Sequence, residues 1–326
     1  MKTYRHGSTG RALVPLAVAC AALVLLGGCR RLEMDVNVAR DGGGERRLVM
    51  TVEPGDVGRD TLSEGQVREL LGVTAGRGWR DGTSERTGDD GKPQVVTTYT
   101  RASRVAALGD WPRAGSDIRM RAAADGAPHA DVQLGSRVAV ETGRGAGVTT
   151  WTYRETFAWD GLQELFAGVA ADRYRDAMAA AFPALGATEL AELRGLARGA
   201  FTVGVRAGGA GEREADLDEE LVIGALADAA AGVVGRARGG SAERLREVAA
   251  AVVKDQDNVI GDYLDRELPG VAIAAETTFA LTLRLPGRVV ETNGEVAADG
   301  SVRWEFGGAD PAGRPLECWA RSESAP

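Results

Sequence analysis

Cysteine and histidine often act as nucleophiles, bases or metal ligands, and this sequence contains few of them. It has three cysteines, Cys20, Cys29 and Cys318, and two histidines, His6 and His129. A structural zinc site of the usual kind needs about four cysteine or histidine ligands. No Gly-x-Ser-x-Gly motif, which would mark a hydrolase nucleophile, is present. The composition therefore predicts no enzyme, no metal site and no cofactor.

Cys29 is the cysteine with the most informative surroundings. Basic residues precede an uncharged, largely apolar run over residues 12–26, and the small residues Gly27 and Gly28 follow. This order is typical of a secretory signal peptide, and the run is shorter than the roughly 20 residues of a membrane-spanning helix. The ending Leu26-Gly27-Gly28-Cys29 resembles the lipobox of bacterial lipoproteins. The resemblance implies that Cys29 receives a diacylglyceryl group and becomes the first mature residue.

A lipidated Cys29 would tether the mature chain to a membrane, because each buried CH₂ of an acyl chain such as palmitate contributes about 0.8 kcal/mol. Residue 30 is arginine rather than aspartate. By resemblance to the Gram-negative sorting rule, this favours the outer membrane, facing the periplasm. Only Cys318 would then remain as a thiol, so no intramolecular disulfide is expected.

The charge of the mature chain excludes one class of partner. Removal of residues 1–28 leaves 36 basic against 47 acidic residues, a net charge near −11. Nucleic-acid binding depends on cationic contacts to phosphate. We therefore expect no nucleic-acid partner.

The mature chain opens with the pattern of a β-hairpin. Apolar residues alternate over residues 32–38 and again over 48–52, with a glycine-rich turn at 41–44. A short helix is expected next, with Thr61 and Glu64 forming its capping box.

Strand patterns continue over residues 78–158. The last strand and the residue that follows it carry four aromatic residues at odd positions, namely Trp151, Tyr153, Phe157 and Trp159. Residues at alternate positions share one face of a sheet. We expect this face to line a cavity for an acyl chain or another apolar ligand, although a packed core is the alternative.

Residues 159–267 are rich in alanine, leucine, glutamate and arginine, and they have helical periodicity. Four helices are predicted, the last from an N-cap at Ser241 through Leu264 and closed by Pro269. The acidic run at residues 212–220 could bind calcium. It more simply opens a helix, where acidic side chains interact favourably with the helix dipole.

Strand patterns return over residues 279–285 and 302–306, with a final strand expected within 314–321. A C-terminal block of this size is small to fold alone. We therefore expect an α+β fold, in which both chain ends build one antiparallel β-rich domain around a helical insertion. The predicted segments are a signal peptide (1–28), the N-terminal part of the β-rich domain (29–158), the insertion (159–267) and the C-terminal part (268–322).

The C-terminal block also resembles a known family. In LppM-like domains of bacterial lipoproteins, a Pro-Gly pair, an apolar pair, Asn-Gly and a Val-x-Trp strand follow in this order. The matching residues here are Pro286, Gly287, Val289, Asn293, Gly294, Val302 and Trp304. The resemblance implies an α+β, lipid-binding-like fold without catalytic residues.

Together these observations predict a non-catalytic, membrane-tethered envelope protein. Its first predicted function is to bind a lipid or other apolar ligand. The alternative is that it serves as a structural or assembly partner of an envelope complex, docking through the helical insertion.

Overall fold

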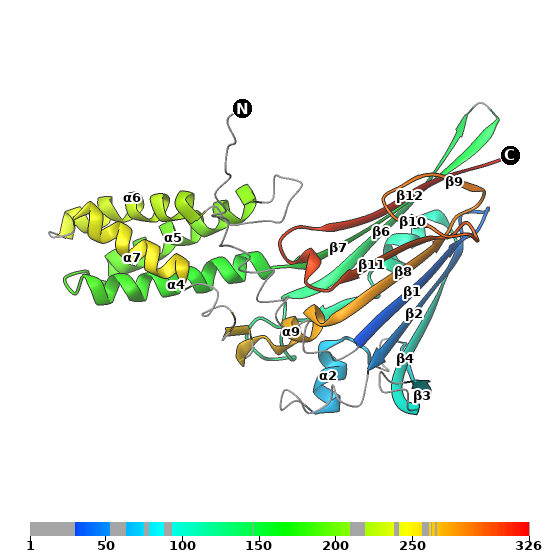
Figure 1. Cartoon of the computed structure of the whole chain (residues 1–326), viewed down its shortest axis with the longest axis horizontal. Helices are drawn as coiled ribbons and strands as arrows, with labels where there is room; N and C mark the ends of the chain where they lie inside the picture. Colours follow the sequence, from blue (N-terminus) through cyan, green and yellow to red (C-terminus); the bar gives the residue numbers. More distant parts are fainter. Residues whose placement is uncertain are drawn as a thin grey trace, which may run out of the picture. The chain divides into compact units, whose positions relative to one another are not determined.

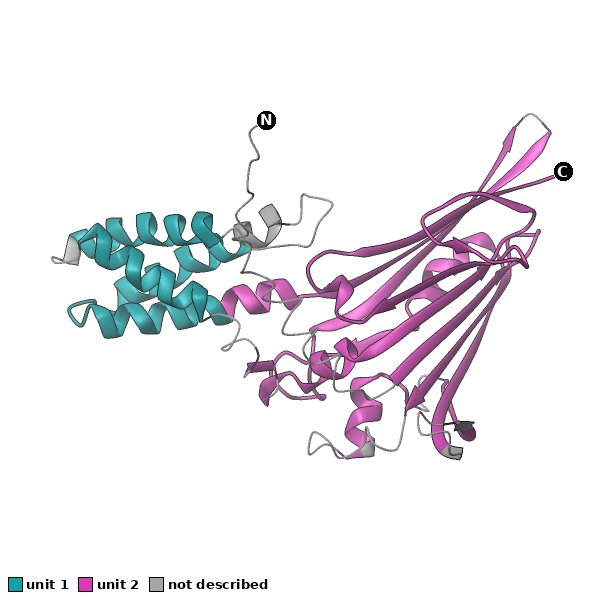
Figure 2. Cartoon of the chain, viewed as in Figure 1, with its two compact units in different colours: residues 1–19, 169–257 teal, residues 20–168, 258–326 magenta. Residues whose placement is uncertain are grey.

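The computed structural model describes residues 30–52, 63–74, 78–87, 93–145, 147–208, 219–237, 241–255, 261, 263–264 and 266–325. The chain divides into two compact units (Figure 2). Unit 1 comprises Met1–Ala19 with Val169–Asp257, and unit 2 comprises Cys20–Gly168 with Asn258–Pro326. The predicted α+β class is confirmed, because unit 2 holds two β-sheets and unit 1 is helical.

The larger sheet of unit 2 contains the N-terminal hairpin (Figure 1). Its described strands run in the order β10 (Glu295–Val296), β11 (Val302–Gly307), β8 (Thr277–Arg284), β1 (Arg30–Val38), β2 (Gly44–Val52), β4 (Pro93–Val105) and β3 (Arg80–Thr87). The predicted hairpin is β1 and β2, which pair with Met34 opposite Leu48. Apolar side chains of these two strands are buried at alternate positions, as the sequence pattern predicted.

The smaller sheet contains the aromatic strand. Its described strands run in the order β5 (Arg119–Arg121), β6 (Gln133–Gly145), β7 (Val148–Asp160), β12 (Leu316–Ser324) and β9 (Arg288–Thr292). β6 and β7 pair along their whole length, from Gln133 opposite Asp160 to Gly145 opposite Val148.

Both chain ends contribute to both sheets, as predicted. C-terminal strand β8 lies beside β1, and C-terminal strand β12 lies between β7 and β9. The β1–β8 pair is parallel, with Met34 opposite Leu281, whereas the other pairs in the two sheets are antiparallel. Parallel strands need a long connection. The sequence between β1 and β8 supplies it, because it contains β2 to β7 and the helices of unit 1.

The two sheets pack against each other through aromatic rings. The ring of Phe157 on β7 lies 4.8 Å from that of Phe306 and 6.0 Å from that of Phe279, measured between centroids. Phe279 and Phe306 stack at 5.1 Å. These distances are in the favourable range for aromatic pairs, so they stabilise the core between the sheets.

Short helices occupy the connections of unit 2. They are α2 (Glu64–Leu70), η3 (Leu108–Asp110), α3 (Trp111–Gly115), α9 (Pro269–Ala275) and η4 (Asp310–Ala312). The predicted helix α2 is present, but its capping box is formed by Ser63 and Gln66 rather than by Thr61 and Glu64. The Ser63 hydroxyl accepts from the backbone N–H of Gln66, and the Gln66 side chain accepts from the backbone N–H of Ser63. Thr61 lies outside the described residues.

The helices of the insertion are α4 (Leu162–Ala181), α5 (Ala187–Gly208), α6 (Glu219–Ala237) and α7 (Ala242–Lys254). Ser241 caps α7 as predicted, but α7 ends at Lys254 rather than at Leu264. Helical backbone at residues 266–267 ends just before Pro269, as predicted for a helix stop, and Pro269 also begins α9 at its first turn, where its missing N–H costs nothing. None of the described helices has the length and apolarity needed to cross a membrane.

Candidate functional site

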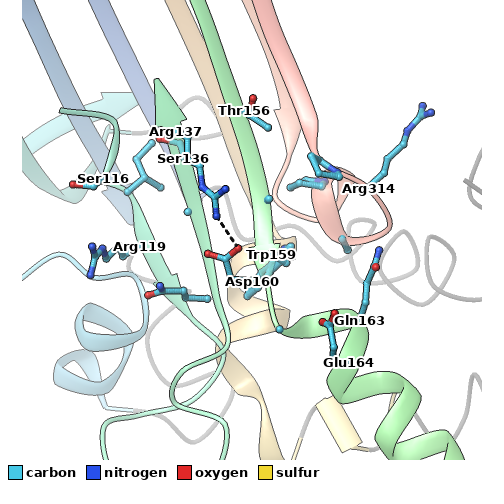
Figure 3. A pocket seen from close by; sticks show the side chains of 18 of the residues that line it. Ser116, Arg119, Ser136, Arg137, Thr156, Trp159, Asp160, Gln163, Glu164 and Arg314 are labelled. Atoms are coloured by element: carbon cyan, nitrogen blue, oxygen red, sulfur yellow. Dashed lines mark hydrogen bonds and ion pairs between the residues drawn. The ribbon is translucent and has the colours of Figure 1, made fainter. Parts of the chain in front are cut away.

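A pocket of about 470 Å³ lies on the outer face of the smaller sheet, entirely within unit 2 (Figure 3). Its floor is formed by β6 and β7, where Gly135 lies opposite Ala158 and Arg137 lies opposite Thr156. Directly opposed residues on one face of a sheet are close neighbours. Because Gly135 and Ala158 have almost no side chain, the floor is hollow at this pair.

Three separate segments form the walls of the pocket. α3 and the following residues provide Pro112, Ser116 and Ile118, the segment around η4 provides Pro311 and Ala312, and the start of α4 provides further residues.

Two glycines place these walls. Gly115 lets α3 approach β6 closely, since a Cβ at this position would lie 2.7 Å from the backbone N of Val138. Gly161 has a φ of +80°, which glycine adopts without strain, and it turns the chain from β7 into α4.

The pocket lining carries both signs of charge. Arg137 Nη2 lies 3.5 Å from Asp160 Oδ1, and both side chains are more than half exposed. Arg119, Arg314 and Glu164 also line the pocket. An ion pair as exposed as Arg137–Asp160 contributes about 0–1 kcal/mol, so a ligand can replace either partner.

The two serines in the lining are engaged by the backbone. The Ser116 hydroxyl donates to the carbonyl of Arg113 at 2.8 Å, and the Ser136 hydroxyl donates to the carbonyl of Gly115 at 2.7 Å. A serine nucleophile instead needs a base that accepts its proton. The Ser136 hydroxyl therefore holds α3 against β6, and the Ser116 hydroxyl bonds the last turn of α3.

The four aromatic residues predicted as a ligand face do share one face, at the inner side of the smaller sheet. Trp151, Tyr153 and Phe157 are buried between the sheets, which is the packed-core alternative. Trp159 is also mostly buried, and it is the member of this group that reaches the pocket. Its Nε1–H donates to the carbonyl of Gly308, which orients the ring.

The same buried face contains a charged residue that the sequence analysis did not single out. Glu155 lies between Tyr153 and Phe157 and is fully buried, as is Arg46 of β2. Arg46 donates to Glu155 through Nη1 at 3.0 Å and Nη2 at 2.7 Å, and the Tyr153 hydroxyl donates to Glu155 at 2.5 Å. A glutamate at an odd position within the aromatic alternation was the available clue. Its partner on β2 could not be read from the sequence.

Burial and charge determine the protonation of this cluster. Burial alone would lower the pKa of Arg46, but the negative charge and hydrogen bonds of Glu155 outweigh it, so the pKa is raised. Burial, followed by the charge of Glu155, holds the pKa of Tyr153 well above its usual value. Burial, again followed by Glu155, raises the pKa of the Cys318 thiol. These groups therefore keep their ordinary protonation states at neutral pH and do not resemble an activated nucleophile or base.

Other predicted sites fall outside the pocket. Cys29 lies outside the described residues. His129 is partly buried, and its ring lies 6.3 Å from that of Tyr263. Cys318 is a free, buried thiol. In the described part of the chain, no group of three or more histidine, cysteine, aspartate or glutamate residues is arranged to hold a metal ion.

Comparison with known proteins gave one structural likeness. No protein-family model matches the chain, and no curated protein matches it in sequence. The chain is similar to the NMR structure of the folded domain of the Mycobacterium tuberculosis LppM protein, with 9% sequence identity over 92% of each chain and a TM-score of 0.29.

Proposed function

We propose that this chain is a non-catalytic lipoprotein of the cell envelope, tethered through Cys29, whose unit 2 binds a small ligand with an apolar part. The observation that carries the proposal is the pocket on the outer face of the smaller sheet, with its floor at Gly135 and Ala158. Three segments separated in sequence build its walls, so the pocket belongs to the folded unit as a whole.

The size and lining of the pocket support a small-molecule ligand. Its volume of about 470 Å³ lies within the range of roughly 300–1,000 Å³ found for such sites. Apolar surface comes from Trp159, Ile118 and the prolines of two walls, beside a few charged groups. This mixture suits an amphipathic ligand better than a purely aliphatic one.

The chemistry of the lining supports a binding role rather than a catalytic one. Both serine hydroxyls donate to backbone carbonyls. The carboxylate of Asp160 pairs with Arg137 and not with a serine hydroxyl of the lining.

Native mass spectrometry of the unlipidated Cys29→Ser protein tests the binding function. We expect a bound small molecule on the protein purified from its own host. Ala158→Trp fills the floor of the pocket and should abolish this mass. Thr152→Trp places the same bulk on the outer side of β7 away from the lining, and it should retain the ligand. A ligand that survives Ala158→Trp, or no ligand in any form, would contradict the proposed site.

The membrane tether is tested independently of the pocket. Cells that express the full chain should incorporate radioactive palmitate into it, and Cys29→Ser should prevent this. Globomycin, which blocks lipoprotein signal peptidase, should leave a heavier precursor. Equal masses with and without globomycin would contradict lipidation. In a Gram-negative host, the lipidated protein should fractionate with the outer membrane.

One observation favours the second candidate function, docking of an envelope partner on unit 1. Leu196 on α5 is 42% exposed, and Leu221 on α6 is 48% exposed. A contiguous apolar patch built from such side chains would mark an interaction surface. Crosslinking in intact cells should give one dominant adduct that Leu196→Glu with Leu221→Glu removes. Loss of this adduct in Ala158→Trp instead would assign the contact to unit 2.

A further inference from the structure

The charged residues of the pocket favour one sign of ligand charge. Three arginines line it from three different elements, with Arg119 on β5, Arg137 on β6 and Arg314 before β12. The acidic residues of the lining are Asp160 and Glu164. The lining thus has one more positive than negative charge, in a chain whose formal net charge is −8.

Two of these arginines have no acidic partner among the described residues. Within the described residues, neither Arg119 nor Arg314 has a carboxylate within ion-pair distance, and only Arg137 is paired, with Asp160. The Arg137–Asp160 pair is 82% and 54% exposed, so its loss costs little. All three guanidinium groups can therefore donate to an incoming anion.

Both charged and apolar side chains line the pocket. Figure 3 shows the guanidinium group of Arg137 beside Asp160, with Arg119 and Arg314 on either side and their guanidinium groups directed outward. Trp159, Pro311 and Ala312 provide apolar surface in the lining. Arginine side chains commonly cover apolar surface with their stems and keep the charge in water. An amphipathic ligand would place its apolar part against these residues and its charge beside an arginine.

We infer that the ligand is a small anionic amphiphile, with a carboxylate, phosphate or sulfonate group bound by arginines of the pocket lining, of which Arg119 and Arg314 have no ion-pair partner among the described residues. Planar guanidinium groups bind such oxyanions through paired hydrogen bonds. A pocket of about 470 Å³ accommodates one apolar chain or ring system and not the two chains of a diacyl phospholipid. This inference rests on the proposed ligand-binding function and adds the chemical class of the ligand.

Two fluorescent probes with one shared skeleton test the inference. 8-Anilinonaphthalene-1-sulfonate carries a sulfonate, and N-phenyl-1-naphthylamine is its neutral counterpart. Both are titrated into the Cys29→Ser protein and into Arg119→Gln with Arg314→Gln. The charge-matched control is Arg104→Gln with Arg303→Gln, two exposed arginines of the larger sheet.

We expect the sulfonate probe to bind more tightly than the neutral probe, and the pocket double variant to lose about tenfold of the sulfonate affinity. Neutral-probe binding and the control variant should stay unchanged. Arg119→Lys with Arg314→Lys, which keeps both charges, should recover part of the affinity. Far-ultraviolet circular dichroism of every variant establishes that it is folded.

Each other outcome overturns a specific statement. Equal affinity of both probes, or no effect of the Arg119 and Arg314 substitutions, would overturn the anionic ligand and leave the proposed pocket standing. If neither probe binds, or if the probes bind Ala158→Trp as tightly as the Cys29→Ser protein, the proposed pocket is overturned as well. Displacement of the probe by decanoate, decyl phosphate and neutral decanol then identifies the head group. Displacement by decanol as strong as by both anions would also contradict the inference.

Discussion

The buried ion pair between Arg46 and Glu155 gives the sharpest quantitative prediction. Both side chains have no exposed surface, and Glu155 also accepts from the Tyr153 hydroxyl. Replacing Glu155 by leucine leaves a buried guanidinium without its carboxylate, which should lower the free energy of unfolding by about 3–5 kcal/mol. Replacing Arg46 by methionine leaves a buried carboxylate and should cost a similar amount.

The double variant Arg46→Met with Glu155→Leu should be far more stable than the sum of the single changes. It leaves no unpaired buried charge, and the main loss is the acceptor of the Tyr153 hydroxyl, about 1–3 kcal/mol. The coupling free energy between the two positions should therefore be about 3 kcal/mol or more.

Urea unfolding followed by tryptophan fluorescence measures this coupling within unit 2, because all six tryptophans belong to that unit. The matched control is the exposed pair Arg154–Glu317, which also joins β7 to another strand and should contribute at most about 1 kcal/mol. Single changes at Arg46 and Glu155 that each cost less than about 1 kcal/mol would refute the reasoning. Purely additive changes would refute it as well.

Three further predictions concern individual residues. Phe157→Ala should lower the free energy of unfolding by about 3–5 kcal/mol, because the ring fills the space between the sheets, and urea denaturation measures the loss. Cys318 should react with iodoacetamide at pH 8 only after unfolding, because burial raises its pKa and blocks access; rapid labelling of the native protein would contradict this. Hydrogen bonds from Ser301 lower the pKa of Asp299 to about 2. Its stabilising contribution should therefore be complete above the unfolded pKa near 3.8 and disappear as the pH falls toward 2, so urea midpoints of the native protein and of Asp299→Asn should converge over this range.

The strand patterns were predictable because alternation of apolar residues follows directly from the geometry of a sheet with one buried face. The β1–β2 hairpin and the shared face of Trp151, Tyr153 and Phe157 follow from this rule. The use of this face was not determined by the pattern. A buried aromatic row looks the same in sequence whether it lines a cavity or packs against a second sheet, and here Phe157 contacts Phe279 and Phe306.

The errors at helix ends have local physical causes. Thr61 with Glu64 and Ser63 with Gln66 both fit the capping-box pattern, so the pattern could not choose between them, and in the structure Ser63 and Gln66 form the box. Helical spacing of apolar residues continued past Lys254, although α7 ends there. Proline is compatible with the first turn of a helix as well as with a helix stop, and Pro269 lies at both, after the helical residues 266–267 and at the start of α9.

The sequence by itself predicted an export signal and a tether at Cys29, and it determined the alternation that defines most strands, since each depends on residues that are close in the chain. The tertiary structure decided three features that depend on distant segments. These are the parallel β1–β8 pair, the Arg46–Glu155 ion pair and the pocket over Gly135 and Ala158. Each brings together residues more than 20 positions apart in the sequence. The periodicity of one segment does not determine which residue of a distant segment will contact it.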